Sequence, residues 1–213
     1  MNFLENARQA RLVRKEEKEE NVTRFLGYYL DRLSVSEAPD PTERIATVIA
    51  RSPRSPVARS IMALAPELRD QDLLVKVVFA KLDPADALAG FIDLAVPATS
   101  EKPLCMLRWA RNPALIDAHE QLVLGSAMCW LGDSMRREPE NRDAYELFET
   151  CNGEIARRTS LSFRALWEAS ASVPFSRFRT NASGLGHEVD LSDTNPVAEL
   201  MLGRSTTTAS TRH

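Results

Sequence analysis

Three histidines are the residues best suited to proton transfer near neutral pH, and only one lies in a segment expected to fold. His187 and His213 fall in the polar C-terminal stretch, whereas His119 lies in the sequence DAHEQ between Asp117 and Glu120. In the helix expected there, neighbours one and two positions away point in different directions, so these carboxylates form no proton relay with the imidazole. The sequence favours a structural or partly exposed His119, with an enzyme built around this residue as an alternative.

Motifs that identify common catalytic or cofactor sites are absent from the chain. It has no glycine-rich phosphate loop, no GxSxG nucleophile elbow and no HExxH zinc motif. A di-iron bundle requires Glu-x-x-His pairs, and no such pair occurs. We therefore expect no catalytic, cofactor-binding or metal-binding residues, no cofactor, and a protein that is not an enzyme.

The three cysteines do not suggest a disulfide framework. Cys105, Cys129 and Cys151 are odd in number and lie more than twenty positions apart. Zinc sites use closely spaced ligand pairs, and disulfides belong to oxidising compartments. The spacing therefore predicts buried, reduced thiols.

Arginines recur in close pairs and suggest a surface that contacts phosphates. The candidate nucleic-acid contacts are Arg108 with Arg111, Arg157 with Arg158, and Arg177 with Arg179. Trp109 and Phe178 lie beside two of these pairs, and such rings stack on bases. The sequence favours a structural account instead, in which arginines near helix C-termini, such as Arg136 and Arg137, complement the helix dipole and pair with glutamates.

Composition indicates one ordinary globular domain with tails. The chain has 213 residues, 44% of them hydrophobic and 27% charged, with a net charge of -3. This charge creates no general attraction to nucleic acid or to anionic membranes. No run approaches the roughly 20 apolar residues of a membrane span, and the N-terminus lacks the apolar run of a secretory signal. We expect a cytoplasmic protein without a membrane span.

Capping residues followed by proline predict the starts of several helices. Such pairs occur at Asp40–Pro41, Ser55–Pro56, Asp83–Pro84 and Asn112–Pro113. The chain also shows an apolar stripe from Val22 to Leu33 at helical spacing. The expected helices cover residues 2–34, 41–51, 56–64, 67–82, 84–95, 113–136 and 139–171, the last with a break at Asn152–Gly153.

Two of these helices rest on weaker arguments. DLLVKVVFAKL, residues 72–82, has the composition of a buried strand, but no other segment was identified as its partner, so a helix is expected. The segment 113–136 is apolar nearly all round, which predicts a central helix. Gly125 and Gly132 would allow its neighbours to approach closely.

These elements predict an all-α fold, an irregular bundle of about seven helices. A faint similarity between residues 40–53 and 83–97 raises HEAT-like helix pairs as a variant. We expect a projecting, charged N-terminal helix over 1–21, a helical core over 22–172 and a flexible tail over 173–213. The tail contains a short helix-forming motif near 195–202.

The two ends suggest a function in binding other proteins. A charged helix and a tail with a helix-forming motif bury little surface on their own domain. We therefore expect a non-enzymatic intracellular adaptor or complex subunit that binds another protein. An alternative is that the chain binds further copies of itself in a homo-oligomer. The expected partner-binding residues are Leu4, Leu12, Val13, Val197, Leu200 and Met201. The alternatives are a nucleic-acid-binding or defence-associated regulator and the enzyme with its site at His119.

Overall fold

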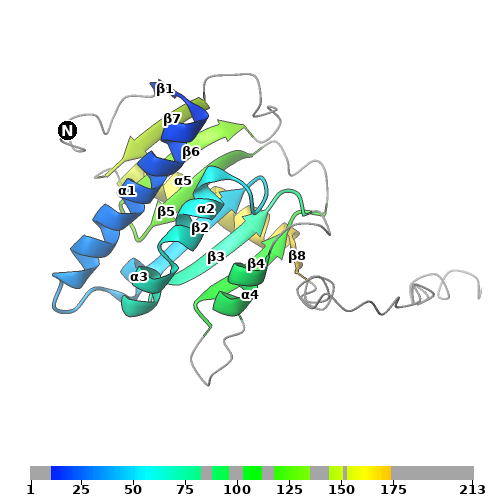
Figure 1. Cartoon of the computed structure of the whole chain (residues 1–213). Helices are drawn as coiled ribbons and strands as arrows, with labels where there is room; N and C mark the ends of the chain where they lie inside the picture. The colour runs from blue at the N-terminus through cyan, green and yellow to red at the C-terminus, as the bar shows by residue number, and fades with distance from the viewer. Residues whose placement is uncertain are drawn as a thin grey trace, which may run out of the picture. The chain divides into compact units, whose positions relative to one another are not determined.

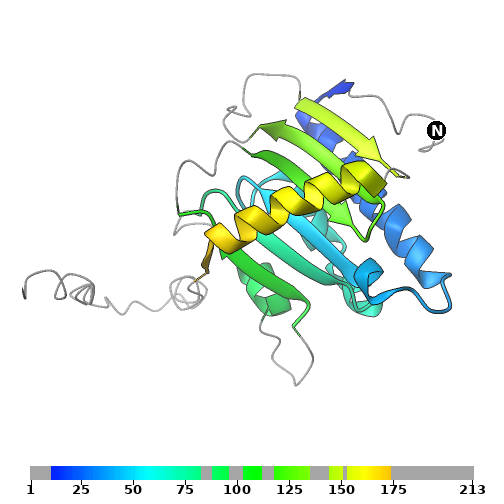
Figure 2. The ribbon, with the colours of Figure 1, turned by 180° about the vertical axis from the view of Figure 1, so that it is seen from behind.

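The protein has a mixed α/β fold. The computed structural model describes residues 11–82, 88–95, 103–111, 118–134, 144–150 and 153–173. These stretches form an eight-stranded sheet with helices on both faces (Figures 1 and 2). The expected all-α bundle, with or without HEAT-like pairs, is therefore wrong.

The sheet contains one parallel block flanked by antiparallel strands. Its strands lie in the order β1-β7-β6-β5-β2-β3-β4-β8. β2, β3 and β4 are parallel to one another, and every other pairing is antiparallel. The strands are β1 (Arg11–Val13), β2 (Ile45–Ala50), β3 (Leu74–Phe79), β4 (Cys105–Trp109), β5 (His119–Leu124), β6 (Met128–Ser134), β7 (Ala144–Glu149) and β8 (Ala171–Ser172).

Helices cover the two faces unequally. The helical elements are α1 (Lys15–Ser34), the 3-10 turn η1 (Pro41–Arg44), α2 (Pro56–Ala63), α3 (Ala65–Asp70), α4 (Ala89–Ala95) and α5 (Gly153–Ala169). On one face α1 buries Val22, Phe25 and Leu26 of the expected apolar stripe. On the other face α5 crosses the strands diagonally (Figure 2). Within the described part of the chain, no helix is long and apolar enough to span a membrane.

The segment DLLVKVVFAKL contains strand β3, so the helix expected over 67–82 is wrong beyond Asp70. Val75 and Val77 face the core on the α1 side, and Val78 packs in the cluster under α5. A parallel strand covered on both faces reads as a continuous apolar run. Its partners in the sheet are β2 and β4. The sequence predicts a helix over 41–51, where the structure has β2, and no element where it has β4.

The expected central helix over 113–136 is a hairpin of β5 and β6. Its apolar residues lie on both sides because both faces of these strands are covered. Gly125 has a φ of 57° and makes the turn, so it is not a helix-packing residue. Likewise, the proline start at Asp40 begins only the turn η1 before β2, and the segment 139–171 contains β7 before α5.

Other expectations are confirmed. The Ser55–Pro56 start begins α2, and α5 begins at Gly153, beside the expected break. Cys105 and Cys129 are free and buried, and burial raises the pKa of their thiols to about 12 and about 11. Cys151 lies outside the described residues.

The turn at Gly125 joins three elements, which yields a stability prediction. The Glu43 carboxylate accepts hydrogen bonds from the Ser126 amide (3.1 Å), the Ser126 hydroxyl (2.6 Å) and the Tyr29 hydroxyl (3.0 Å). A Cβ at Gly125 would collide with Glu43 and Tyr29.

Gly125→Ala should therefore lower the free energy of unfolding by about 2 kcal/mol, since the left-handed conformation alone costs an L-residue about 1–2 kcal/mol. Gly27→Ala is the matched control, because Gly27 lies within α1 with open space around its Cα. It should stabilise the protein by about 0.5–1 kcal/mol. Urea titrations of both variants check the opposite signs, and equal effects would contradict this account of the turn.

Candidate functional site

The carboxyl ends of the three parallel strands carry a row of cations. Arg51 directly follows β2, whose last residue is Ala50. Lys81 and Arg111 follow β3 and β4 after one further alanine in each case. We call these three residues the cation row. Neighbouring strands lie about 4.8 Å apart, so the row spans about 10 Å of backbone.

Backbone hydrogen bonds keep the strand ends aligned. The Ala80 amide donates to the Ala50 carbonyl (2.9 Å), and the Lys81 amide donates to the Arg51 carbonyl (2.8 Å). On the next strand the Ala110 amide donates to the carbonyl of Phe79 (2.8 Å). The ladder therefore continues past the strands proper and places the cations at one end of the sheet.

Two members of the cation row are open to solvent. Lys81 and Arg111 are exposed, whereas Arg51 is half-buried. The Arg111 guanidinium carbon lies 5.4 Å from the centre of the Trp109 ring. This cation–π contact orients Arg111 without neutralising its charge.

The row begins where the order of the strands reverses. From β2 the chain passes to β3 and β4 on one side, and it then returns to β5 on the other side of β2. In open α/β sheets, ligands bind outside the carboxyl ends of the strands at such a switch point. Arg51 and the start of β5 therefore occupy the position where this architecture usually holds a ligand.

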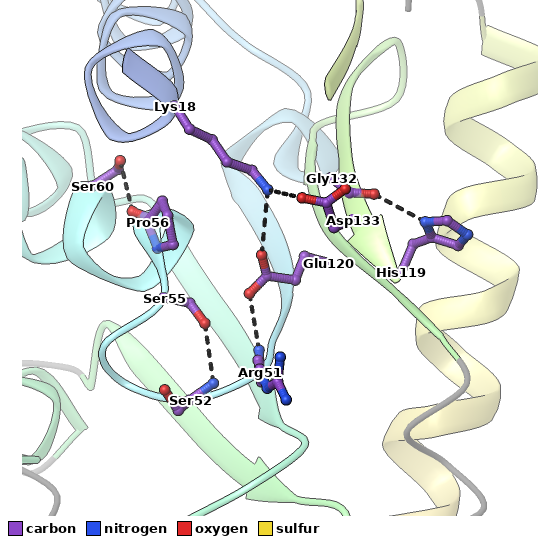
Figure 3. A network of polar contacts seen from close by, with 10 residues as sticks. All are labelled: Lys18, Arg51, Ser52, Ser55, Pro56, Ser60, His119, Glu120, Gly132 and Asp133. Atoms are coloured by element: carbon purple, nitrogen blue, oxygen red, sulfur yellow. Dashed lines mark hydrogen bonds and ion pairs between the residues drawn. The ribbon is translucent and has the colours of Figure 1, made fainter. Parts of the chain in front are cut away.

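A buried lysine organises the polar groups behind this point (Figure 3). Lys18 of α1 is 3% exposed, and its Nζ lies 3.2 Å from Asp133 Oδ2 and 3.7 Å from Glu120 Oε2. The ammonium also lies 5.2 Å from the centre of the Trp130 ring. Glu120 Oε1 accepts the Arg51 amide at 3.1 Å. Lys18 thus connects α1 to the first residue after β2.

The loop between β2 and α2 is fixed by its own serines. The Ser52 amide donates to Ser55 Oγ at 3.1 Å, and the Arg54 amide donates to Ser52 Oγ at 3.2 Å. Pro56 then starts α2. These bonds hold the loop beside the cation row and leave Arg54 exposed there.

His119 begins β5 and is exposed. Its Nδ1 lies 2.9 Å from the Gly132 carbonyl oxygen, which only accepts, so Nδ1 carries the proton. In the neutral ring Nε2 then keeps its lone pair, which can accept a proton or bind an electrophile. Figure 3 shows the ring turned away from Lys18 and Glu120. Glu120 therefore forms no relay with it, as the sequence predicted, although strand alternation is the cause.

Metal chemistry finds no support in the stretches of chain that the structure describes. They contain no group of three or more His, Cys, Asp or Glu side chains placed to hold an ion. Asp117, which the sequence places near His119, lies outside them.

The arginines expected to contact nucleic acid are dispersed. Arg108 donates to the Trp167 carbonyl at 2.6 Å, near the C-terminus of α5. Arg157 and Arg158 both pair with Glu154, at 3.0 and 2.7 Å. Ten residues of α5 separate Arg157 from Trp167, or about 15 Å along the helix. Arg111 belongs to the cation row, and Arg177 and Arg179 lie outside the described residues.

The expected partner-binding residues stay a prediction. Val13 is 7% exposed in β1, and Leu12 belongs to the same strand. The other four lie outside the described residues: Leu4, Val197, Leu200 and Met201.

Sequence reasoning missed Arg51, Lys81 and Lys18. One signal was available, because an alanine followed by a cation recurs every 30 residues at positions 50–51, 80–81 and 110–111. Such a repeat at the ends of three apolar runs indicates three similar strands, although in the sheet Arg51 lies opposite Ala80, one residue before Lys81. Lys18 gave no signal, since its neighbours in KEEKEE are also charged.

Sequence comparison finds no matching family model and no matching curated protein. Three solved structures are similar over 78% of this chain. TrmBL2, an archaeal chromatin protein, has a TM-score of 0.48 and 14% identity, and 55% of its chain is covered. Nuc from Salmonella typhimurium, a phospholipase D family member, has 0.46 and 11%, with 97% of its chain covered. NucT from Helicobacter pylori has 0.46 and 10%, with 99% covered.

Lys18→Met tests the buried network. The change preserves the bulk of the side chain but leaves Glu120 and Asp133 without their ammonium partner. Removing one partner of a buried ion pair costs about 3–5 kcal/mol, and Asp133 is partly solvated, so we expect a loss of about 3 kcal/mol.

Adding Glu120→Gln and Asp133→Asn to Lys18→Met should recover much of that stability, because no buried charge is then left unpaired. Arg158→Ala removes an exposed ion pair and should leave the unfolding midpoint unchanged. Thermal and urea unfolding measure all three. A Lys18→Met protein as stable as the parent would show that the network is not structural.

Proposed function

We propose that the protein binds the phosphate backbone of a nucleic acid at the carboxyl ends of β2, β3 and β4. The observation that carries this proposal is the position of the cation row beside the switch point of the sheet. The three cations leave adjacent strands at one end of the sheet, with Lys81 opposite Arg111 and Arg51 opposite Ala80, and such a cluster suits a ligand with several negative charges.

Local charge supports a polyanion. The described residues of the cation row, the β2–α2 loop and the Lys18 network include five cations and two carboxylates. Concentrating positive charge on one surface steers anionic ligands to it.

The chemistry of the row predicts contacts to phosphate rather than to bases. Arginine offers two parallel N–H donors to a phosphate, and lysine offers a compact charge. The residues of the cation row and its loop include no amide or carboxylate side chain that could read a base edge, and the nearby Glu120 is held by Lys18 and by the Arg51 amide. Binding should therefore be largely independent of base sequence and strongly dependent on salt.

The test is fluorescence anisotropy with labelled 20-nucleotide single-stranded DNA, its duplex and the matching RNA, each between 50 and 200 mM salt. The variant is Lys81→Ala with Arg111→Ala, both exposed residues whose loss leaves the Lys18 network intact. The matched control is Arg157→Ala with Arg158→Ala, which removes the same charge from α5. The logarithm of the binding constant falls linearly with the logarithm of the salt concentration. Each lost phosphate contact makes this negative slope shallower by about 0.7 for single strands and about 0.9 for duplex.

We expect the Lys81 and Arg111 variant to lose about 1.5 units of slope and at least tenfold in affinity at low salt, and the control to bind as the parent does. An equal loss in the control would indicate a diffuse charge effect and contradict this site. No binding of any of the three probes would overturn the proposal.

A further inference from the structure

The second surface of interest lies on the α5 face of the sheet, at the opposite end of the same strands. Where α5 crosses this face it buries Ile49 and Val78, which are 0% and 1% exposed. Towards the amino ends of β2, β3 and β4, Figure 2 shows no described helix over the sheet. The residues there that share this face are Ile45, Thr47, Leu74, Lys76 and Met106. We call them the open sheet face.

Strand register makes the open sheet face continuous. Side chains alternate along a strand, so Thr47 shares its face with Ile49, and Lys76 shares its face with Val78. Thr47 pairs with Lys76 across β2 and β3, and Lys76 pairs with Met106 across β3 and β4. One row therefore crosses three strands.

Two residues of that row, Lys76 and Met106, lack something that a covered surface would provide. Lys76 is half-buried and, within the described residues, has no ion-pair partner. The hydroxyl oxygen of Thr47 is buried and has no hydrogen-bond partner. Met106 is 44% exposed on a strand whose other residues are buried or half-buried. A half-buried cation without a partner costs free energy that a complementary surface would recover, whereas the Thr47 hydroxyl is already shielded by the chain itself.

We propose that the open sheet face docks an acidic amphipathic helix of a partner protein, which lies beside α5 and places a carboxylate against Lys76. Helices side by side over one sheet are the usual layer of α/β folds, and α5 supplies only one. Ile45, Leu74 and Met106 provide an apolar contact, which favours a protein helix over a nucleic acid.

A second copy of this chain fits the face less well. A two-fold interface joins the same patch on both subunits, and this patch contains a lysine but no acid to pair with it. The positive charge of Lys76 therefore favours an acidic helix from a different protein as the occupant. This inference does not depend on nucleic-acid binding, because the cation row lies at the other end of the strands.

The experiment uses the full chain and two synthetic helical peptides with the same leucine face. One peptide carries glutamates beside that face and the other carries lysines at the same positions. Isothermal titration should show at least fivefold tighter binding of the acidic peptide. Amide hydrogen exchange should locate protection at the amino ends of β3 and β4.

Three variants sharpen the test. Lys76→Glu should reverse the preference to the lysine peptide, and Met106→Asp should weaken both peptides. Lys81→Glu, the matched charge reversal at the far end of the same strand, should leave the preference unchanged. Circular dichroism confirms that each variant is folded.

Equal binding of both peptides, no binding of either, or an unchanged preference in Lys76→Glu would each overturn the proposal. Light scattering that shows a dimer dissociated by Met106→Asp would also overturn it, because the face would then join two copies. Reversal by Lys76→Glu together with the exchange footprint would establish both the site and its charge preference.

Discussion

The parallel pairing of β2 with β3 and of β3 with β4 is the constraint on which the rest of the structure depends. Parallel strands bring their carboxyl ends to one end of a sheet, and here the ladder extends as far as Arg51 and Lys81. Three cations distant in the chain become neighbours for that reason. Helices cover both faces of β2 and β3 over their carboxyl halves, which explains the apolar runs there.

Burial of Lys18 is the electrostatic counterpart of this arrangement. Glu120, the second residue of the antiparallel strand beside β2, holds the Arg51 amide while Lys18 balances its charge. Further along α1, Asn21 donates to the buried Glu146 of β7 at 2.9 Å. Lys18 and Asn21 in the polar first half of α1 are thus packed against the sheet, whereas Glu17 and Glu20 of the same half are exposed. Lys18 contacts the carboxylates of Glu120 and Asp133 beside the cation row, and Lys18 is positioned by α1, the helix that also builds the core.

The sequence predicted elements whose signals are local and missed those that depend on distant partners. The stripe from Val22 to Leu33, the start of α2 at Pro56 and the buried thiols could be predicted, since each rests on nearby residues. β3 could not, because a short apolar run fits a buried helix as well as a buried strand until its partners are known. The cation row needed the same knowledge, since Lys81 lies 30 residues from both Arg51 and Arg111.

The size of α5 explains why the molecule has two separate candidate surfaces. Eight strands about 4.8 Å apart make a sheet about 34 Å wide, whereas a helix of this length is about 25 Å long and 10 Å across. Arg108 holds the end of α5 at β4, so the helix crosses the sheet along one diagonal. That path leaves His119 exposed at the carboxyl ends and Lys76 uncovered at the amino ends. The two proposed ligands, a polyanion and a helical partner, would therefore lie at opposite ends of the same strands and would not compete.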